Sequence, residues 1–214
     1  MKRLTILGSA LVLSASLPLF AGEKKPAGKD TAEFVSLEQA LETPAQVGSL
    51  NLSHRDLAAI PDGVFTLPNL TKLTVRKNNV TTVPPEIAKL SKLQWLDLGG
   101  NRIAAVPPEI GKLADLNTLY VSDNALTAVP PEIGSLANLE YLNLDRNKLT
   151  ALPPELGKLR KLKWLRVSGN QLTSLPPELA GMPNLKRVYI RENKLTKEEQ
   201  DKIKATLKGV EVEF

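Results

Sequence analysis

The sequence predicts an α/β solenoid, a curved right-handed stack of short coils with a parallel β-sheet on its concave side and short helical turns on its convex side. Three observations predict it. Close copies of the block VPPEIGKL begin at Val83, Val106, Val129, Leu152 and Leu175. Units aligned from Leu70 recur every 23 residues. Each unit alternates leucine with other residues over a few positions, as a strand does. Such a fixed period is typical of repeat architectures, whose units bury their apolar sides against neighbouring units.

The first 21 residues predict a secretory signal peptide. A basic start, Met1 to Arg3, precedes an apolar run from Leu4 to Phe20, and Ala21 suits the position before cleavage. The alternative is an uncleaved membrane anchor, because the run is almost long enough to span a bilayer. Residues 22–34 contain Lys, Gly and Pro without periodicity, which indicates a flexible tether. The expected location is secreted or periplasmic, or anchored to a membrane at the N-terminus.

Residues 35–46 predict a helix that caps the first coil. Ser36 and Gln39 have the spacing of a capping box, and Leu37, Ala40 and Leu41 share one helical face. The repeats then extend over residues 47–195, in about seven units that include an incomplete first unit from Val47.

One unit explains the pattern physically. In the segment Leu142-Asn143-Leu144, alternate side chains point inward, as they do in a strand. The Pro-Pro that follows in each unit ends the strand and opens a helical turn, because a proline is tolerated at the first helical position. Ile110 and Leu113 point the apolar side of such a turn inward. The repeated VPPEIGKL block is therefore the convex return path of each coil.

This pattern resembles the leucine-rich repeat family, whose motif is L-x-x-L-x-L-x-x-N-x-L, from Val47 to about Lys197. The resemblance is to exported bacterial members in particular. It implies a structural role for a ladder of asparagines, whose amides satisfy backbone groups where the chain turns inside the coil. The ladder comprises Asn78, Asn101, Asn124, Asn147, Asn170 and Asn193. Arg55 replaces this Asn in the first unit, which indicates a terminal repeat.

Residues 196–214 predict a C-terminal cap made of a helix and an edge strand. Thr196 and Glu199 repeat the capping-box spacing, and Ile203 and Leu207 supply the apolar stripe. Gly209 ends the helix, and residues 210–214 alternate as a strand does.

The remaining composition favours no catalytic, metal or cofactor site. The chain has no Cys, which excludes thiolate chemistry, and its single His54 lacks partners. Five stacked glutamates stand in the first turns of the convex helical segments, where the helix dipole favours a carboxylate without any cation. They are Glu86, Glu109, Glu132, Glu155 and Glu178. The net charge of +5, interpreted as spread over the chain, is weak support for a nucleic-acid or membrane partner.

The concave face is the predicted binding site. The third, fifth and seventh positions of each unit point outward there, and every Trp and Tyr of the chain falls in this set. The candidate ligand-binding residues are Trp95, Asp97, Tyr120, Tyr141, Asn143, Asp145, Trp164, Arg166, Arg187 and Tyr189. Amphipathic aromatic residues are enriched at protein interfaces, so we expect a non-catalytic module that binds a protein partner. The alternative is a glycan or cell-envelope polymer that stacks on isolated aromatic rings.

Charge on this face has mixed sign. Acidic residues such as Asp97 and Asp145 lie between basic groups near Arg76 and near Arg187. A nucleic-acid backbone prefers uninterrupted positive charge, so we expect no nucleic-acid partner. Scattered carboxylates such as Asp97 and Asp145 could pair, but the sequence shows no convergent, buried site of the kind that acid–base catalysis requires, so we expect no enzyme.

Overall fold

The computed structural model describes residues 33–214. The predicted signal peptide (1–21) and residues 22–32 of the predicted tether lie outside the described residues. The last two residues assigned to the tether, Glu33 and Phe34, form a short strand that pairs with the first repeat strand. The folded unit therefore begins by residue 33, because Phe34 also packs against the apolar core.

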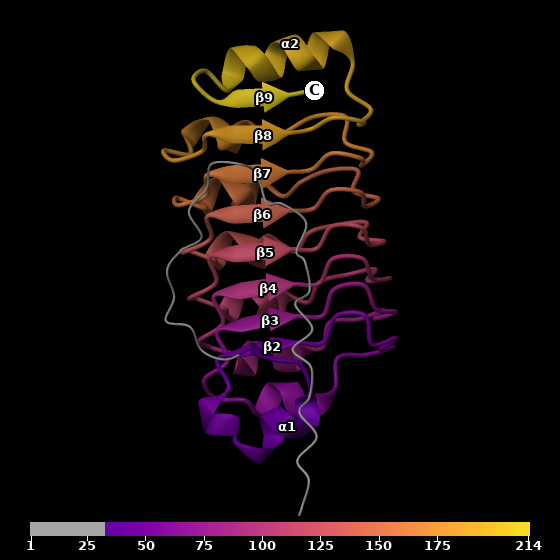
Figure 1. The fold of residues 1–214 in the computed structure, drawn as a ribbon. Helices are drawn as coiled ribbons and strands as arrows, with labels where there is room; N and C mark the ends of the chain where they lie inside the picture. The colour runs from indigo at the N-terminus through magenta and orange to yellow at the C-terminus, as the bar shows by residue number, and fades with distance from the viewer. Residues whose placement is uncertain (1–32) are drawn as a thin grey trace, which may run out of the picture. The chain divides into compact units, whose positions relative to one another are not determined.

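Nine parallel strands form one sheet in chain order, as Figure 1 shows. They are β1 (Glu33–Phe34), β2 (Ser49–Asn51), β3 (Lys72–Thr74), β4 (Trp95–Asp97), β5 (Thr118–Tyr120), β6 (Tyr141–Asn143), β7 (Trp164–Arg166), β8 (Arg187–Tyr189) and β9 (Glu211–Glu213). From β2 to β8, each strand residue pairs with the residue one unit later, so that Leu73 pairs with Leu96. The predicted solenoid with one parallel sheet is confirmed, and β2 to β8 are its seven repeat strands.

The return path of each coil is a short 3-10 helix on the side opposite the sheet. These helices are η2 (Asp62–Thr66), η3 (Pro85–Lys89), η4 (Pro108–Lys112), η5 (Pro131–Ser135), η6 (Pro154–Lys158) and η7 (Pro177–Gly181). In η4 the N–H of Leu113 donates to the carbonyl of Ile110, three residues back. A 3-10 helix is wound more tightly than an α-helix and usually runs for only one turn, as it does here. The proline at its start loses no hydrogen bond, because the first N–H groups of a helix have no partner within it.

Leucine, isoleucine and valine fill the space between sheet and turns. The central strand residues Leu96, Leu119 and Leu142 are at most 1% exposed, and Ile110 from η4 is fully buried. One coil alone would leave these side chains open to water on both sides. Stacking therefore supplies most of the stability, since burial of a Leu or Ile contributes about 1.5–3 kcal/mol.

The asparagine ladder holds neighbouring coils together. The amide of Asn147 donates to the carbonyl of Leu144 in its own coil (3.0 Å) and to that of Val121 in the preceding coil (2.9 Å). Its side-chain oxygen accepts from the N–H of Leu126 (3.0 Å). The same three contacts recur at Asn101, Asn124 and Asn170. These bonds satisfy backbone groups that face the interior, as the predicted structural role of the ladder requires.

The four 3-10 helices η4 to η7 stack so closely that only glycine fits at each of the three contacts between them. A Cβ atom on Gly134 would lie 2.5 Å from the carbonyl oxygen of Glu155 in the next coil. A Cβ atom on Gly111 would lie 2.6 Å from the carbonyl oxygen of Glu132, and one on Gly157 would lie 2.6 Å from the Cβ of Glu178. The Gly of the repeated PPEIGKL block is therefore set by contact between coils.

Both predicted cap helices are present. They are α1 (Leu37–Glu42), followed by the 3-10 turn η1 (Pro44–Gln46), and α2 (Lys197–Thr206). The hydroxyl of Ser36 accepts the predicted hydrogen bond from the N–H of Gln39, and the hydroxyl of Thr196 accepts one from the N–H of Glu199. Ala40 and Ile203 are buried, but Leu41 is 42% exposed and lies across Gly63 rather than inside the core. No helix among residues 33–214 is long and apolar enough to cross a membrane.

Candidate functional site on the sheet face

Four aromatic side chains form a continuous row on the outward face of the sheet. We call this row the aromatic ladder; it consists of Trp95, Tyr120, Tyr141 and Trp164. Successive ring centroids are 5.2, 4.9 and 6.4 Å apart, and the ring planes are tilted by 37–48°. The rings therefore pack against one another and do not stand as isolated platforms.

The pairing register explains how the ladder closes. Trp95, Thr118, Tyr141 and Trp164 occupy one row across strands β4 to β7. Tyr120 belongs to the neighbouring row, and its ring bridges Trp95 and Tyr141 past the small side chain of Thr118. Thr118 is almost completely covered as a result. A large residue at position 118 would compete with the Tyr120 ring for this space.

Cations flank the aromatic rings. Lys72 lies 6.0 Å from the Trp95 ring, and Lys163 lies 5.9 Å from the Trp164 ring, so a cation stands at each end of the ladder. Beyond the ladder, the guanidinium of Arg166 lies 4.6 Å from the Tyr189 ring. Arg187 donates to the Tyr189 hydroxyl at 3.0 Å. Cations over ring faces stabilise the packing by about 0.5–1 kcal/mol at exposed sites.

The charges of the sheet face are paired within the protein. Lys72 pairs with Glu33 across β2, and the other ion pairs join neighbouring coils or strands: Arg76 with Asp97, Arg146 with Asp123, Lys163 with Glu140, Arg166 with Asp145, Arg187 with Glu211 and Arg191 with Glu213. The hydrogen bond from Arg146 lowers the pKa of Asp123. The mixed-sign pattern of the sequence is thus a set of ion pairs whose charges largely neutralise one another. The aromatic rings are therefore the main feature of the face that a partner could contact.

Three of the predicted polar site residues have structural partners. Asp97 accepts from the N–H of Gly99 and Asn143 accepts from the N–H of Asp145, both at 2.9 Å. Asp145 is 1% exposed and accepts from Arg166 Nε (2.6 Å) and from the N–H of Ser168 (2.8 Å). Burial raises the pKa of Asp97 more than the Gly99 N–H and Arg76 lower it. The oxygens of these side chains are engaged in hydrogen bonds within the protein, so they offer few acceptors to a partner.

The two ladder tyrosines keep their protons. Burial raises the pKa of both the Tyr120 and the Tyr141 hydroxyls. A protonated phenol both donates and accepts hydrogen bonds, so the ladder combines apolar rings with polar tips. This combination is typical of aromatic anchors at protein interfaces.

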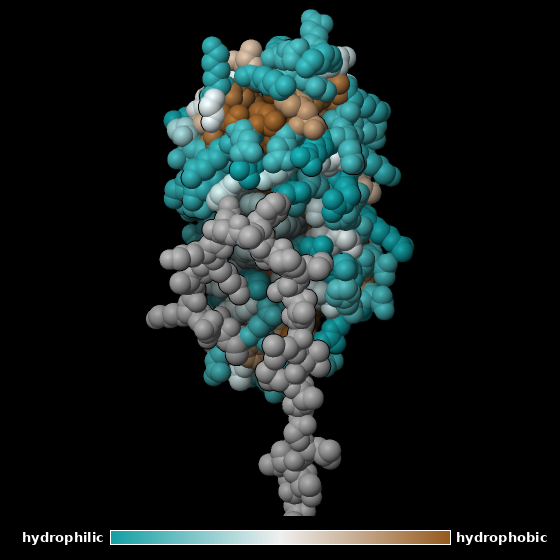
Figure 2. Space-filling model, turned by 45° about the horizontal axis from the view of Figure 1, so that its top comes forward, coloured by the Kyte–Doolittle hydropathy of each residue, from teal (hydrophilic) through white to brown (hydrophobic). Residues whose placement is uncertain are grey.

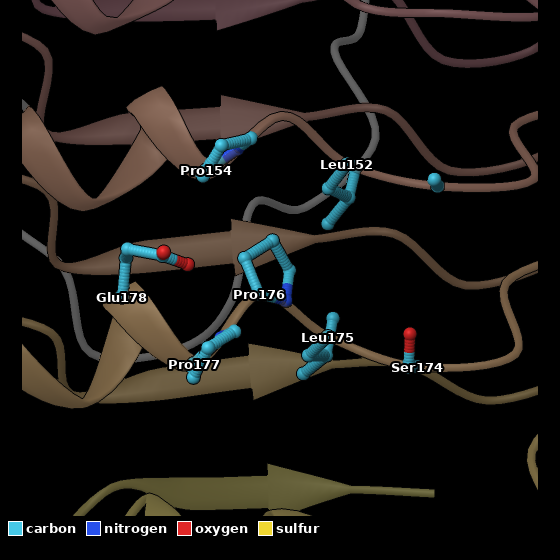
Figure 3. A pocket seen from close by; sticks show the side chains of 8 residues that line it. Leu152, Pro154, Ser174, Leu175, Pro176, Pro177 and Glu178 are labelled. Carbon is cyan, nitrogen blue, oxygen red and sulfur yellow. The ribbon is translucent and has the colours of Figure 1, made fainter.

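The side opposite the sheet offers a weaker candidate. A shallow, open hollow of about 290 Å³ lies between the coils of η6 and η7, lined by Leu152, Pro154, Leu175 and Pro176 among others (Figure 3). Ser174 and Glu178 are its polar side chains. They do not converge on a point as a catalytic pair would. Within residues 33–214, no group of three His, Cys, Asp or Glu side chains is placed to hold a metal ion.

Comparison with known proteins places these features in a family. A family model described as "Leucine rich repeat" matches residues 45–103 and 114–172. A second model, of two leucine-rich repeat copies, matches residues 160–200. None of the curated proteins compared with the chain matches it.

Solved structures give the same result. A leucine-rich repeat protein of Leptospira interrogans is 32% identical over 84% of the chain, with a TM-score of 0.71. The plant peptide hormone receptor RGFR1, in complex with RGF2, is 32% identical over 64% (TM-score 0.60). The ectodomain of the Arabidopsis thaliana receptor kinase GASSHO1/SCHENGEN3, in complex with CASPARIAN STRIP INTEGRITY FACTOR 2, is 25% identical over 84% (TM-score 0.59). The chain covers 51% of the Leptospira protein and 23% and 25% of the two receptor chains.

Proposed function

Because the chain belongs to the leucine-rich repeat family, we propose that it is a non-catalytic binding module that recognises a protein or peptide through the aromatic ladder. The observation that carries the proposal is the continuous contact of four rings across β4 to β7. Two structural neighbours are receptor ectodomain or hormone receptor structures in complex with partners, which supports a proteinaceous ligand here.

The geometry favours a protein over a glycan. Sugar rings stack best on flat aromatic faces that lie open to solvent, whereas the ladder rings are tilted and pack against each other. A cluster of this kind presents edges and hydroxyl tips that suit apolar side chains and backbone groups. The glycan alternative remains a separate outcome of the binding experiment, tested by competition with soluble polysaccharide.

We expect Trp164→Ala to weaken partner binding by roughly thirtyfold, or about 2 kcal/mol, since aromatic anchors dominate interface energies. Its contacts with Tyr141 and Lys163 lie on the protein surface, so unfolding should become easier by about 1 kcal/mol or less. Partners captured by the parent chain would be identified and their affinities measured for each variant. Glu132→Ala, exposed on η5, is the control.

Two results would contradict this proposal. Equal partner affinity for the parent, Trp164→Ala and Glu132→Ala would place the interface away from the ladder. Loss of binding in Glu132→Ala alone would move it to the side of the 3-10 helices. If soluble polysaccharide displaced the captured partner from the parent chain, and this competition also depended on Trp164, the result would favour the glycan alternative.

We further propose that the protein is exported, with the mature chain beginning near Gly22. The apolar run from Leu4 to Phe20 and the small residue Ala21 support this. N-terminal sequencing of the protein from culture medium, periplasm, membrane and cytoplasm is the direct measurement. Intact Met1 in the membrane fraction would favour the anchor, and intact Met1 in the soluble cytoplasm would contradict export.

A further inference from the structure

Within the aromatic ladder, Tyr120 is the ring that leaves its own row. Its backbone position belongs to the row of Asp97, yet its ring packs against Trp95 and Tyr141 of the neighbouring row. The centroid distances to those two rings are 5.2 Å and 4.9 Å. The Tyr120 ring therefore occupies a space above Thr118, whose own side chain is too small to fill it.

This space has the dimensions of one aromatic ring. Trp95 on β4 and Tyr141 on β6 form its walls, and Thr118 on β5, the strand between them in Figure 1, forms its floor. Strands two steps apart in a sheet are separated by about 10 Å, which suits two rings with a third ring between them. We call the space bounded by Trp95, Thr118 and Tyr141 the ring slot.

The chemistry of the ring slot favours an aromatic occupant. Its walls are an indole and a phenol, and aromatic pairs in tilted arrangements gain energy beyond the area that they bury. At its floor, the hydroxyl of Thr118 donates to the side-chain oxygen of Asn117 at 2.9 Å, so the hydroxyl proton is already engaged. A side chain in the slot is therefore held mainly by contacts with the two rings.

Tyr120 contributes to the slot from the sheet surface and not from the core, because its side chain is half-buried. More than one χ1 rotamer is common for residues in strands, so the sheet does not restrict the ring to the slot. The next outward position of the same strand is Ser122, beside Gly99, and both side chains are small. Rotation of Tyr120 out of the slot sacrifices two ring contacts, which an incoming ring would restore.

We propose that the ring slot binds an aromatic side chain of the protein or peptide partner, which takes the place of the Tyr120 ring. The inference rests on the proposed function and specifies the contact that the partner makes at the centre of the aromatic ladder. In the free protein Tyr120 is an internal occupant, and it lowers the affinity for any side chain that must displace it. A side chain that inserts between two rings is typical of the few residues that dominate an interface.

Other occupants and other surfaces are less well supported. A sugar ring needs hydrogen bonds for its hydroxyls, whereas the slot offers two ring walls. Figure 2 shows apolar surface near the top of the view, at the C-terminal end. The partly buried residues of that end, such as Val212 and Phe214, pack against the core, and no contact within residues 33–214 indicates the size or chemistry of a partner there. In the ring slot, the Tyr120 ring itself shows what fits.

The first test titrates the full chain with p-cresol, which is the tyrosine side chain as a free compound, and with 4-methylcyclohexanol, which has a similar size but no aromatic ring. Tyr120→Ala empties the slot, and Tyr120→Phe keeps a ring in it. Tyr120→Ala combined with Thr118→Leu fills the slot from its floor. The chain has two Trp, so in NMR spectra the indole N–H of Trp95 reports on a wall of the slot and that of Trp164 is the internal reference.

We expect Tyr120→Ala to bind p-cresol at least about tenfold more tightly than the parent does, since two ring contacts become available. The Trp95 signal should shift more than the Trp164 signal. Tyr120→Phe and the double variant should bind p-cresol as weakly as the parent. Equal p-cresol affinity for the parent and Tyr120→Ala would overturn the proposal, and so would equal affinity of Tyr120→Ala for both compounds.

The second test measures the affinity of the partner captured by the parent chain. Tyr120→Ala should bind it about tenfold more tightly, because no internal ring has to be displaced, whereas Trp164→Ala should bind it more weakly. Unchanged or reduced affinity in Tyr120→Ala, with reduced affinity in Trp164→Ala, would make the ring-slot proposal wrong and leave the proposed function standing. Unchanged affinity in both variants would contradict the proposed function itself and the ring slot with it.

Discussion

Replacing Asn147 by Ala is expected to lower the free energy of unfolding by about 2–3 kcal/mol, because a buried backbone donor loses its partner. The N–H of Leu126 bonds to the Asn147 side chain, and Ala offers no acceptor in its place. The carbonyls of Val121 and Leu144 keep one bond each, from Asn124 and Asn170. Urea unfolding of parent and variant measures the difference.

The control for this substitution is Asn184→Ala. Asn184 is exposed and donates one hydrogen bond, to the carbonyl of Arg160. Its removal should change the free energy of unfolding by about 0.5 kcal/mol or less, as is usual for surface positions. Similar midpoints for the parent and Asn147→Ala would show that water replaces the amide, and that the ladder is not a stabilising feature.

Replacing Gly134 by Ala is expected to destabilise the protein by about 2–3 kcal/mol, although Ala is ordinarily the better helix former. The new methyl group would lie 2.5 Å from the carbonyl oxygen and 2.9 Å from the Cβ of Glu155. These are the backbone oxygen and the Cβ of Glu155 in η6, so the two coils must move apart to make room for the methyl group. For a chain of this size, the melting temperature should fall by roughly 5–10 °C.

Gly181→Ala supplies the comparison, since no atom lies within 4 Å of its added Cβ. We expect its stability to equal or slightly exceed that of the parent. The chain carries Ala88 and Ala180 at the place of Gly134 in η3 and η7, the first and last turns of this kind. A melting temperature of Gly134→Ala as high as that of Gly181→Ala would mean that the middle coils are as loosely stacked as these terminal ones.

Much of the fold could be predicted from the spacing of residues. The strand positions, the turn after each Pro-Pro, the asparagine ladder and both capping boxes depend on contacts within one coil or between equivalent residues of adjacent coils. A repeated pattern specifies such contacts many times over. The exposure of Leu41 was not predicted, because helical spacing marks a face without showing how far the first coil extends beneath it.

The candidate site was predicted less completely. The outward rows placed the aromatic residues on one face, and the structure joins four of them into the aromatic ladder. Spacing did not indicate that Asp97, Asn143 and Asp145 bond to nearby backbone groups. It also did not pair the charges, since side-chain rotamers decide which acidic residue a cation reaches.

The sequence by itself determined the 23-residue coil, the order of the strands and the identity of the buried leucines, because these depend on a period that the chain repeats. Only the tertiary structure decided where a single Cβ atom would meet the next coil, which rings touch diagonally between rows, and which acidic residue each paired cation reaches. The physical reason is distance. Periodicity sets which residues are neighbours, whereas these features depend on the separation of neighbouring coils and on side-chain rotamers to within about 1 Å.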